Sequence, residues 1–267
     1  MGYGCHLGRA DHPRFYASVN MNPNDVSAAM RSRIEEALRA DSEPRLATFD
    51  FDGTCIENDI GEATLGYMAE HRLNGVSPDT FERYYAAIDT GDIIEPYRAC
   101  ARILAGMTAS DVSALVDAVL AAEGQLVGTR ELWGRSILKG IRPRESTMRL
   151  ITLLENSGVT VRIVSASAEP LVIAASRHFG LSCPVTGIRL AVENGAFTRE
   201  IEVPTPISEG KVACIRQLMG EKRPLVGAGD SMNDLPMLEH CDIPVAVAPS
   251  KKLEAIARER GWNILVC

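Results

Sequence analysis

The sequence has no apolar run long enough to span a bilayer, and its first twenty residues lack the apolar stretch of a signal peptide. Its seven cysteines are odd in number and include no C-x-x-C pair, which is typical of reduced thiols rather than of a disulfide framework. Aromatic residues make up only 5%. These absences predict a cytoplasmic protein that does not contact a membrane.

Basic residues are also scarce. Lys and Arg number 28 against 35 Asp and Glu, which gives a formal net charge of -7. Nucleic acids and anionic membranes are held by wide basic faces, so we expect neither as a partner. A small anionic substrate is compatible with this charge, because one local site can be positive on an acidic protein.

The rest of the composition is that of an ordinary globular protein, with 46% hydrophobic and 24% charged residues. A chain of 267 residues can form one large domain, or a core that carries a smaller inserted domain.

Strand and helix patterns alternate along most of the chain. Strands are expected at residues 46–49, 159–164, 224–226, 243–247 and 263–266, with helices at 143–157, 169–179 and 208–219. Such alternation predicts an α/β fold, with a Rossmann-like parallel sheet flanked by helices. Between the second and third of these strands, Asn194-Gly195 separates two alternating stretches and predicts a hairpin.

Two regions are expected in addition to this core. Residues 1–41 read as an extended arm followed by a helix, which begins at Asn24 or Asp25 and would pack on the core or on a second subunit of a homodimer. Residues 59–140 show helical patterns, with capping signals at Ser77-Pro78 and Ser110-Asp111 and no convincing strand. We therefore predict an all-helical cap inserted after the first strand, with the catalytic core formed by residues 42–58 and 141–267.

The sequence Asp50-Phe51-Asp52-Gly53-Thr54 follows the first predicted strand. In open parallel sheets, ligands bind at this edge. Asp50 and Asp52 are two residues apart in an extended segment, so their carboxylates can converge, and Gly53 lets backbone N–H groups approach a phosphate. The alternative is a solvated acidic turn.

A second acidic loop, Gly227-Ala228-Gly229-Asp230-Ser231-Met232-Asn233-Asp234, follows a later strand. Its carboxylate and carbonyl oxygens suit Mg²⁺, which prefers oxygen ligands. A dinucleotide fingerprint is excluded, because Met232 stands at the third glycine position and the loop is acidic where a pyrophosphate would lie.

Two further residues are candidates for phosphate binding. Ser165 ends a strand and could offer a hydroxyl and an N–H group, although it or Ser167 could instead be a helix cap. Lys211 follows Glu209-Gly210 near a helix start and could neutralise a phosphate, although a lone lysine is usually a surface group.

Asp-x-Asp-Gly-Thr, Ser, Lys and Gly-Asp-x-x-x-Asp, in this order and each at the mouth of a strand or helix, resemble the haloacid dehalogenase (HAD) superfamily. The chain looks most like the phosphoserine-phosphatase branch, through the inserted cap, the hairpin after Gly187-Ile188-Arg189-Leu190, and Gly229-Asp230-Ser231-Met232-Asn233-Asp234. The resemblance implies a Mg²⁺-dependent phosphatase that acts on a small phosphate ester.

The resemblance also implies a role for each residue. Asp50 would be the nucleophile and Asp52 the general acid and base. Mg²⁺ would be held by Asp50, the backbone carbonyl of Asp52 and Asp230, with Asn233 and Asp234 orienting its ligands. The phosphoryl oxygens would be bound by Ser165, Lys211 and the backbone around Phe51, Gly53 and Ala166, while Thr54 orients the loop.

The cap would contact the leaving group. Asp59 corresponds to the acidic residue with which phosphoserine phosphatases hold the substrate amine, although it could simply be a helix N-cap. Cys100 stands where that branch carries an arginine for the serine carboxylate, and Arg98 and Arg102 lie one helical turn apart and could replace it. With Tyr84 nearby, the substrate is expected to be an amine-bearing phosphate ester that is phosphoserine-like or phosphocholine-like.

Two other functions remain open at this stage. One is a phosphotransferase, in which a small alcohol replaces water as the acceptor. The other is a non-catalytic binding protein with the same fold, against which the four intact acids at 50, 52, 230 and 234 argue.

Overall fold

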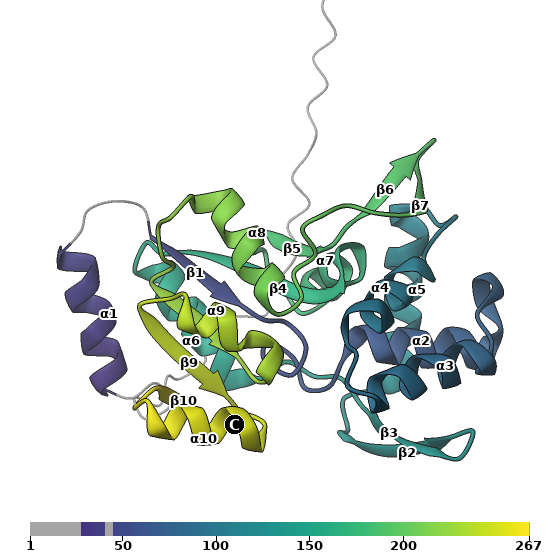
Figure 1. Ribbon diagram of the computed structural model, residues 1–267, viewed down its shortest axis with the longest axis horizontal. Helices are drawn as coiled ribbons and strands as arrows, with labels where there is room; N and C mark the ends of the chain where they lie inside the picture. Colours follow the sequence, from purple (N-terminus) through teal and green to yellow (C-terminus); the bar gives the residue numbers. More distant parts are fainter. Residues whose placement is uncertain (1–27, 41–44, 267) are drawn as a thin grey trace, which may run out of the picture.

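The computed structural model describes residues 28–40 and 45–266, and its centre is a six-stranded sheet whose neighbouring strands all run parallel (Figure 1). The strand order is β10-β9-β8-β1-β4-β5. The strands are β1 (Leu46–Phe49), β4 (Thr160–Ala168), β5 (Val185–Ile188), β8 (Val226–Gly229), β9 (Ile243–Val247) and β10 (Asn263–Leu265). The predicted α/β architecture is confirmed.

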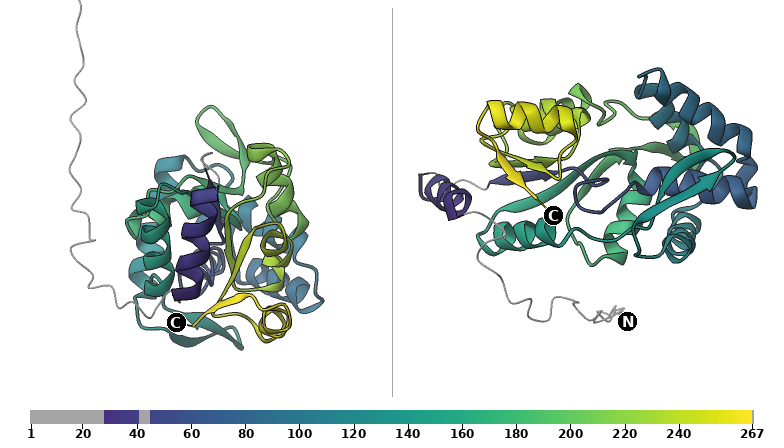
Figure 2. Two further views of the ribbon diagram at one scale, coloured as in Figure 1. Left: turned by 90° about the vertical axis from the view of Figure 1, so that its left-hand side faces the viewer. Right: turned by 90° about the horizontal axis from the view of Figure 1, so that it is seen from below.

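Helices cover both faces of this sheet, as the apolar strands require. Phe49, Ile163 and Val245 are completely buried, and parallel strands need such cover on both sides. In Figure 2, α8, α9 and α10 lie on one face and α6 and α7 on the other. Their bounds are α6 (Glu145–Asn156), α7 (Glu169–His178), α8 (Glu209–Met219), α9 (Leu235–Glu239) and α10 (Lys251–Glu259).

The N-terminal helix α1 (Ala28–Ala40) packs on the core through the buried side chains of Met30 and Ile34. The predicted N-caps Asn24 and Asp25, and the predicted arm, lie outside the described residues. No helix in the described ranges is both long enough and apolar enough to cross a membrane.

Residues 59–140, called the cap segment below, lie between β1 and α6 in the chain and form a separate group of elements in Figure 1. Their helices are α2 (Ile60–His71), η1 (Leu73–Gly75), α3 (Pro78–Asp89), α4 (Ile94–Arg102) and α5 (Ala109–Glu123). The two connections to the sheet run side by side, because Glu57 N donates to Arg142 O (2.8 Å) and Arg144 N donates to Cys55 O (2.9 Å).

The cap segment is not all-helical, which corrects one detail of the sequence prediction. β2 (Gly128–Leu132) and β3 (Arg135–Lys139) form an antiparallel hairpin. Its turn, Trp133-Gly134, has positive φ at both residues (46° and 80°), the backbone of a two-residue hairpin turn. Trp at the first turn position hid the signal, because Asn or Gly is usual there.

A second hairpin, β6 (Leu190–Glu193) and β7 (Ala196–Ile201), confirms the turn predicted at Asn194-Gly195. This hairpin belongs to the core but contacts the cap segment. Gly106 N donates to Phe197 O (2.7 Å), and Phe197 N donates to Met107 O (2.8 Å). The cap segment is therefore attached to the core at a point far from its two chain connections.

Candidate active site

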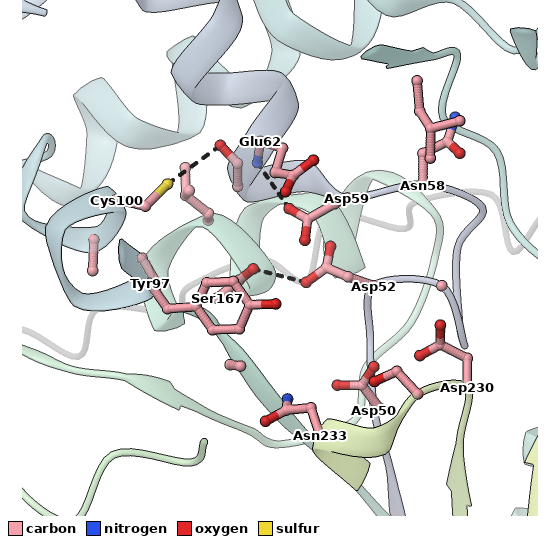
Figure 3. A pocket seen from close by; sticks show the side chains of 18 of the residues that line it. Asp50, Asp52, Asn58, Asp59, Glu62, Tyr97, Cys100, Ser167, Asp230 and Asn233 are labelled. Carbon is pink, nitrogen blue, oxygen red and sulfur yellow. Dashed lines mark hydrogen bonds between the residues drawn. The ribbon is translucent and has the colours of Figure 1, made fainter. Parts of the chain in front are cut away.

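Three adjacent strands end at one edge of the sheet and place the predicted site residues together. β1 pairs with β4 on one side and with β8 on the other. Asp50 directly follows β1, Ser165 lies near the end of β4, and Asp230 directly follows β8. Figure 3 shows Asp50, Asp52 and Asp230 around a common cavity, at the sheet edge where ligands bind in parallel folds.

Lys211 links the loop after β1, which carries Asp50, to the loop after β8, which carries Asp234. It comes from the first turn of α8, and its completely buried Nζ donates to Asp50 Oδ1 (2.6 Å), Asp234 Oδ1 (2.6 Å) and Val164 O (2.9 Å). Burial alone would lower the pKa of Lys211, but the charges of Asp234 and Asp50 outweigh it and raise this pKa. The ammonium therefore remains charged beside Asp50.

Asp234 lies in the short 3₁₀ helix η2 (Met232–Asp234), and both of its oxygens are used within the protein. Oδ1 accepts from Lys211, while Oδ2 accepts from Asp230 N, Ser231 N and Ser231 Oγ, each at 3.1 Å. Asp234 therefore shapes the loop that carries Asp230 and holds Lys211 in place. Asn233 Oδ1 accepts from Ser208 N (2.7 Å) and joins this loop to α8.

Asp50, Asp230 and Asp234 have ligand atoms within 4.8 Å of one another, a spacing that suits one divalent cation. Because both oxygens of Asp234 are engaged, Asp50 and Asp230 are the pair with oxygens left for an ion. Thr54 Oγ1 lies between them, 3.5 Å from Asp50 Oδ2 and 3.4 Å from Asp230 Oδ1. Burial and the charge of Asp234 raise the pKa of Asp230 to about 7. A hard, oxygen-only donor set of this kind fits Mg²⁺.

Two glycines allow the acids to approach so closely. Gly53 has φ +73°, and a Cβ atom there would collide with the carboxylate of Asp230. A Cβ atom on Gly229 would collide with the side chain of Asp234. The glycines in the two motifs therefore make room for carboxylates of the site.

Asp52 is held by hydrogen bonds on both of its oxygens. Oδ1 accepts from Ile60 N (2.8 Å), and Oδ2 accepts from Ser167 Oγ (2.8 Å) and Ser165 Oγ (3.3 Å). Burial raises the pKa of Asp52, and these three donors oppose the shift. A raised pKa favours the protonated form, which a general acid needs.

The predicted phosphate-binding backbone needs one correction. Gly53 N donates to Asn58 O (3.0 Å), because residues 53–58 close a tight loop, so this N–H is not available to a phosphate here. Phe51 is completely buried beneath the loop. Ala166 lines the cavity, and Ser165 lies beneath it with its hydroxyl directed to Asp52.

The cavity has a volume of about 300 Å³ and extends from the sheet edge to the cap segment. Its core end is lined by Asp50, Asp52 and Asp230, and its cap end by Asp59, Glu62, Tyr84, Tyr97 and Cys100 (Figure 3). A small molecule in this cavity would contact both parts of the chain at once.

Residues 47–239, well over half of the chain, match the family model of haloacid dehalogenase-like hydrolases. The chain belongs to this family. The membership predicted from the sequence motifs is confirmed, and the matched range includes every acid of the site.

Two similar proteins with assigned names are phosphatases. It is 27% identical to phosphoserine phosphatase SerB1 of Mycobacterium tuberculosis (strain ATCC 25618 / H37Rv), over 96% of this chain and 81% of that protein. It is 25% identical to histidinol-phosphatase of Neisseria meningitidis serogroup C (strain 8013), over 82% of this chain and 97% of that protein.

Among solved structures, a protein of unknown function from Bordetella pertussis Tohama I aligns with a TM-score of 0.67 at 20% identity, over 84% of this chain and 99% of that chain. The predicted phosphoserine-phosphatase-like branch and enzyme class, a HAD-type phosphatase, are confirmed.

The cap segment of this HAD phosphatase places two predicted substrate residues away from the cavity. Arg98 donates to Glu95 Oε1 (2.9 Å) and Thr205 Oγ1 (3.2 Å), and Arg102 donates to Glu95 Oε2 (3.4 Å) and Arg199 O (3.3 Å). Neither arginine lines the cavity. The two do share one face of α4, together with Glu95 of the same helix. That face meets Thr205 and Arg199 of the core rather than the cavity, so neither arginine replaces the one expected at Cys100.

Asp59 combines the two roles that the sequence left open. Its Oδ1 accepts from Glu62 N (2.8 Å) as the N-cap of α2, and its side chain also lines the cavity. Glu62, which was not predicted, lines the cavity beside it and accepts from Tyr84 Oη (3.1 Å) and Tyr85 Oη (3.0 Å). The signal for Glu62 was its place one helical turn after Asp59.

Proposed function

We propose that this phosphatase hydrolyses small phosphate monoesters through a covalent aspartyl-phosphate on Asp50. The observation that carries the proposal is the placement of Asp50, which lies beside Asp52 at the core end of the cavity and is paired with the charged Lys211. A carboxylate so placed can attack phosphorus, and the cation counters the charge of the transferring group.

The reaction would take place in two steps. First, an Asp50 oxygen forms a bond to phosphorus while the ester O–P bond breaks, and the Asp52 proton passes to the leaving alcohol. Second, Asp52 takes a proton from water, whose oxygen attacks the same phosphorus and releases inorganic phosphate from Asp50. Ser165 keeps Asp52 in place, and Lys211 holds Asp50 throughout.

Mg²⁺ would be held by the carboxylates of Asp50 and Asp230 and by the backbone carbonyl of Asp52. The side chain of Asp52 is directed to Ile60 and Ser167, so only its carbonyl remains for a cation. When bound, the ion neutralises negative charge around the phosphoryl group.

We expect thorough chelation of divalent cations to lower phosphatase activity on the order of 100-fold or more, and Mg²⁺ to restore it. Asp50 and Asp230 lie close together only in the folded protein, so Mg²⁺ binds the folded state and should raise the midpoint of thermal unfolding. This shift can be measured without substrate. An Asp230→Asn variant should lose most of that thermal shift. Hydrolysis that is unaffected by chelation would contradict the metal assignment.

The cap end of the cavity favours a leaving group that carries an amine. Burial and the charges of Asp52 and Glu62 raise the pKa of Asp59 well above its usual value. No hydrogen bond or ion pair joins Asp59 or Glu62 to a Lys or Arg side chain within the described residues. A substrate ammonium would place a positive charge beside both carboxylates, and Tyr84 and Tyr97 line the same end of the cavity as aromatic residues, which attract cations.

A carboxylate on the leaving group lacks a comparable partner. Among the described residues that line the cavity, Arg144 alone is basic. Its Nε donates to Gly53 O (2.7 Å), and its Nη1 lies 3.9 Å from Glu57 Oε1, so its charge already faces an acid of the protein. We therefore propose an amine-bearing ester without a carboxylate next to the amine, such as 2-aminoethyl phosphate or phosphocholine. Both relatives are named for phosphate esters of amine-bearing alcohols.

We expect Asp59→Asn and Glu62→Gln each to lower kcat/KM for 2-aminoethyl phosphate about 10- to 100-fold, with little change for phenyl phosphate. Asn caps a helix as well as Asp. Gln can accept from one of the hydroxyls of Tyr84 and Tyr85 and donate to the oxygen of the other, so both variants remove charge but keep the packing. Glu95→Gln, outside the cavity, is the matched control. Equal losses on both substrates would contradict the proposed amine-bearing substrate but not the proposed phosphatase activity.

A further inference from the structure

The two shortest hydrogen bonds to the carboxyl group of Asp52 come one from the core and one from the cap segment. Ser167 Oγ, near the end of β4, donates to Oδ2, and Ile60 N, at the start of α2, donates to Oδ1, both at 2.8 Å. With a partner on each oxygen, the carboxyl plane cannot turn without breaking a hydrogen bond. The dashed line in Figure 3 shows the contact with Ser167.

The hydroxyl of Ser167 does not serve as a helix cap. The residue precedes α7, where serine is a frequent N-cap, but the N-cap is Ala168 and no side chain caps this helix. Ser167 N donates to Ser165 Oγ (3.0 Å), and Ser165 Oγ in turn lies 3.3 Å from Asp52 Oδ2. The backbone of Ser167 is thereby held in place, with its hydroxyl aimed at Asp52.

We propose that Ser167 is a positioning residue that orients the Asp52 carboxyl group for proton transfer to the leaving alcohol. This inference rests on the proposed function, because it assigns Ser167 a part in the first step of that reaction. As the O–P bond breaks, the Asp52 proton moves to the alcohol oxygen and Asp52 becomes a carboxylate. Ser167 keeps its own proton and donates a hydrogen bond to that carboxylate.

The role can be separated from a general structural one by the basicity of the leaving group. Nitrophenolate leaves readily as an anion, whereas a more basic phenolate needs a proton as its bond to phosphorus breaks. A misaligned Asp52 therefore slows the hydrolysis of esters of basic phenols more than that of nitrophenyl phosphate. The constant kcat/KM isolates this step, because it reports only the steps up to release of the phenol.

The experiment measures kcat/KM with Mg²⁺ for a series of para-substituted phenyl phosphates, from nitrophenyl to methoxyphenyl, which are similar in size. For Ser167→Ala we expect a loss of about 10-fold or more at the methoxy end and of less than about 3-fold at the nitro end. In an Asp52→Asn background, the same change should have no further effect on the slope of the series.

Ser176→Ala is the control, because Ser176 is also buried and its hydroxyl has no hydrogen-bond partner within the described chain. It should leave the whole series unchanged. Equal losses across the series in Ser167→Ala would overturn the positioning role while leaving the phosphatase intact. A native chain that hydrolyses none of these esters would instead refute the proposed function.

Discussion

The Asp50→Asn variant is expected to hydrolyse phosphate esters on the order of 10⁴-fold more slowly than the native chain, or not at all. The amide nitrogen is not a nucleophile, and an amide beside Lys211 loses the ion pair that holds this side chain at 2.6 Å. Release of inorganic phosphate from phenyl phosphate in the presence of Mg²⁺ measures the loss.

The same variant tests the covalent intermediate directly. Native protein that is quenched in acid during turnover should carry one phosphoryl group by intact mass, and Asp50→Asn should carry none. Asp117→Asn, which changes an exposed acid on α5, is the matched control and should behave as the native chain does. Near-normal turnover by Asp50→Asn would end the mechanism and would favour a site in which water attacks phosphorus directly.

The Lys211→Met variant should be less stable than the native chain by about 3–5 kcal/mol, because it leaves the buried carboxylates of Asp50 and Asp234 without their cation. Methionine fills a similar volume, so the loss reports the missing charge rather than a cavity. Urea denaturation with divalent cations chelated measures the difference without help from a bound ion.

Lys251→Met, on the exposed surface of α10, should unfold at the native urea concentration and serves as the control. Restoring charge balance offers a second check. Adding Asp234→Asn to Lys211→Met should cost less than the two single changes together, since one unpaired carboxylate is removed. An unchanged unfolding midpoint in Lys211→Met would show that this buried ion pair does not stabilise the fold.

The acids of the site could be grouped from the sequence because strand ends are easy to recognise. Asp50 and Asp230 are far apart in the chain, yet each directly follows an apolar strand, and the carboxyl ends of parallel strands share one edge. The sequence alone therefore predicted that the two acids lie close together. The position of Lys211 followed from the order of the motifs in a family that the chain resembles.

Other residues depended on directions that the sequence does not contain. The spacing of Arg98 and Arg102 shows that they share a helix face, but not that this face meets Thr205 and Arg199 instead of the cavity. The occupied N–H of Gly53 depends on how residues 53–58 close into a loop. Ser167 is an ordinary residue type, and only the structure shows that its hydroxyl meets Asp52.

Gly53 and Gly229 have a consequence for comparing related chains. The space where their side chains would begin is filled by Asp230 and Asp234. A homologue with alanine or a larger residue at either position cannot hold the neighbouring acid as it is held here, even when all the acids are kept. A residue other than glycine at either position therefore indicates a homologue whose acids are arranged differently from those of this chain.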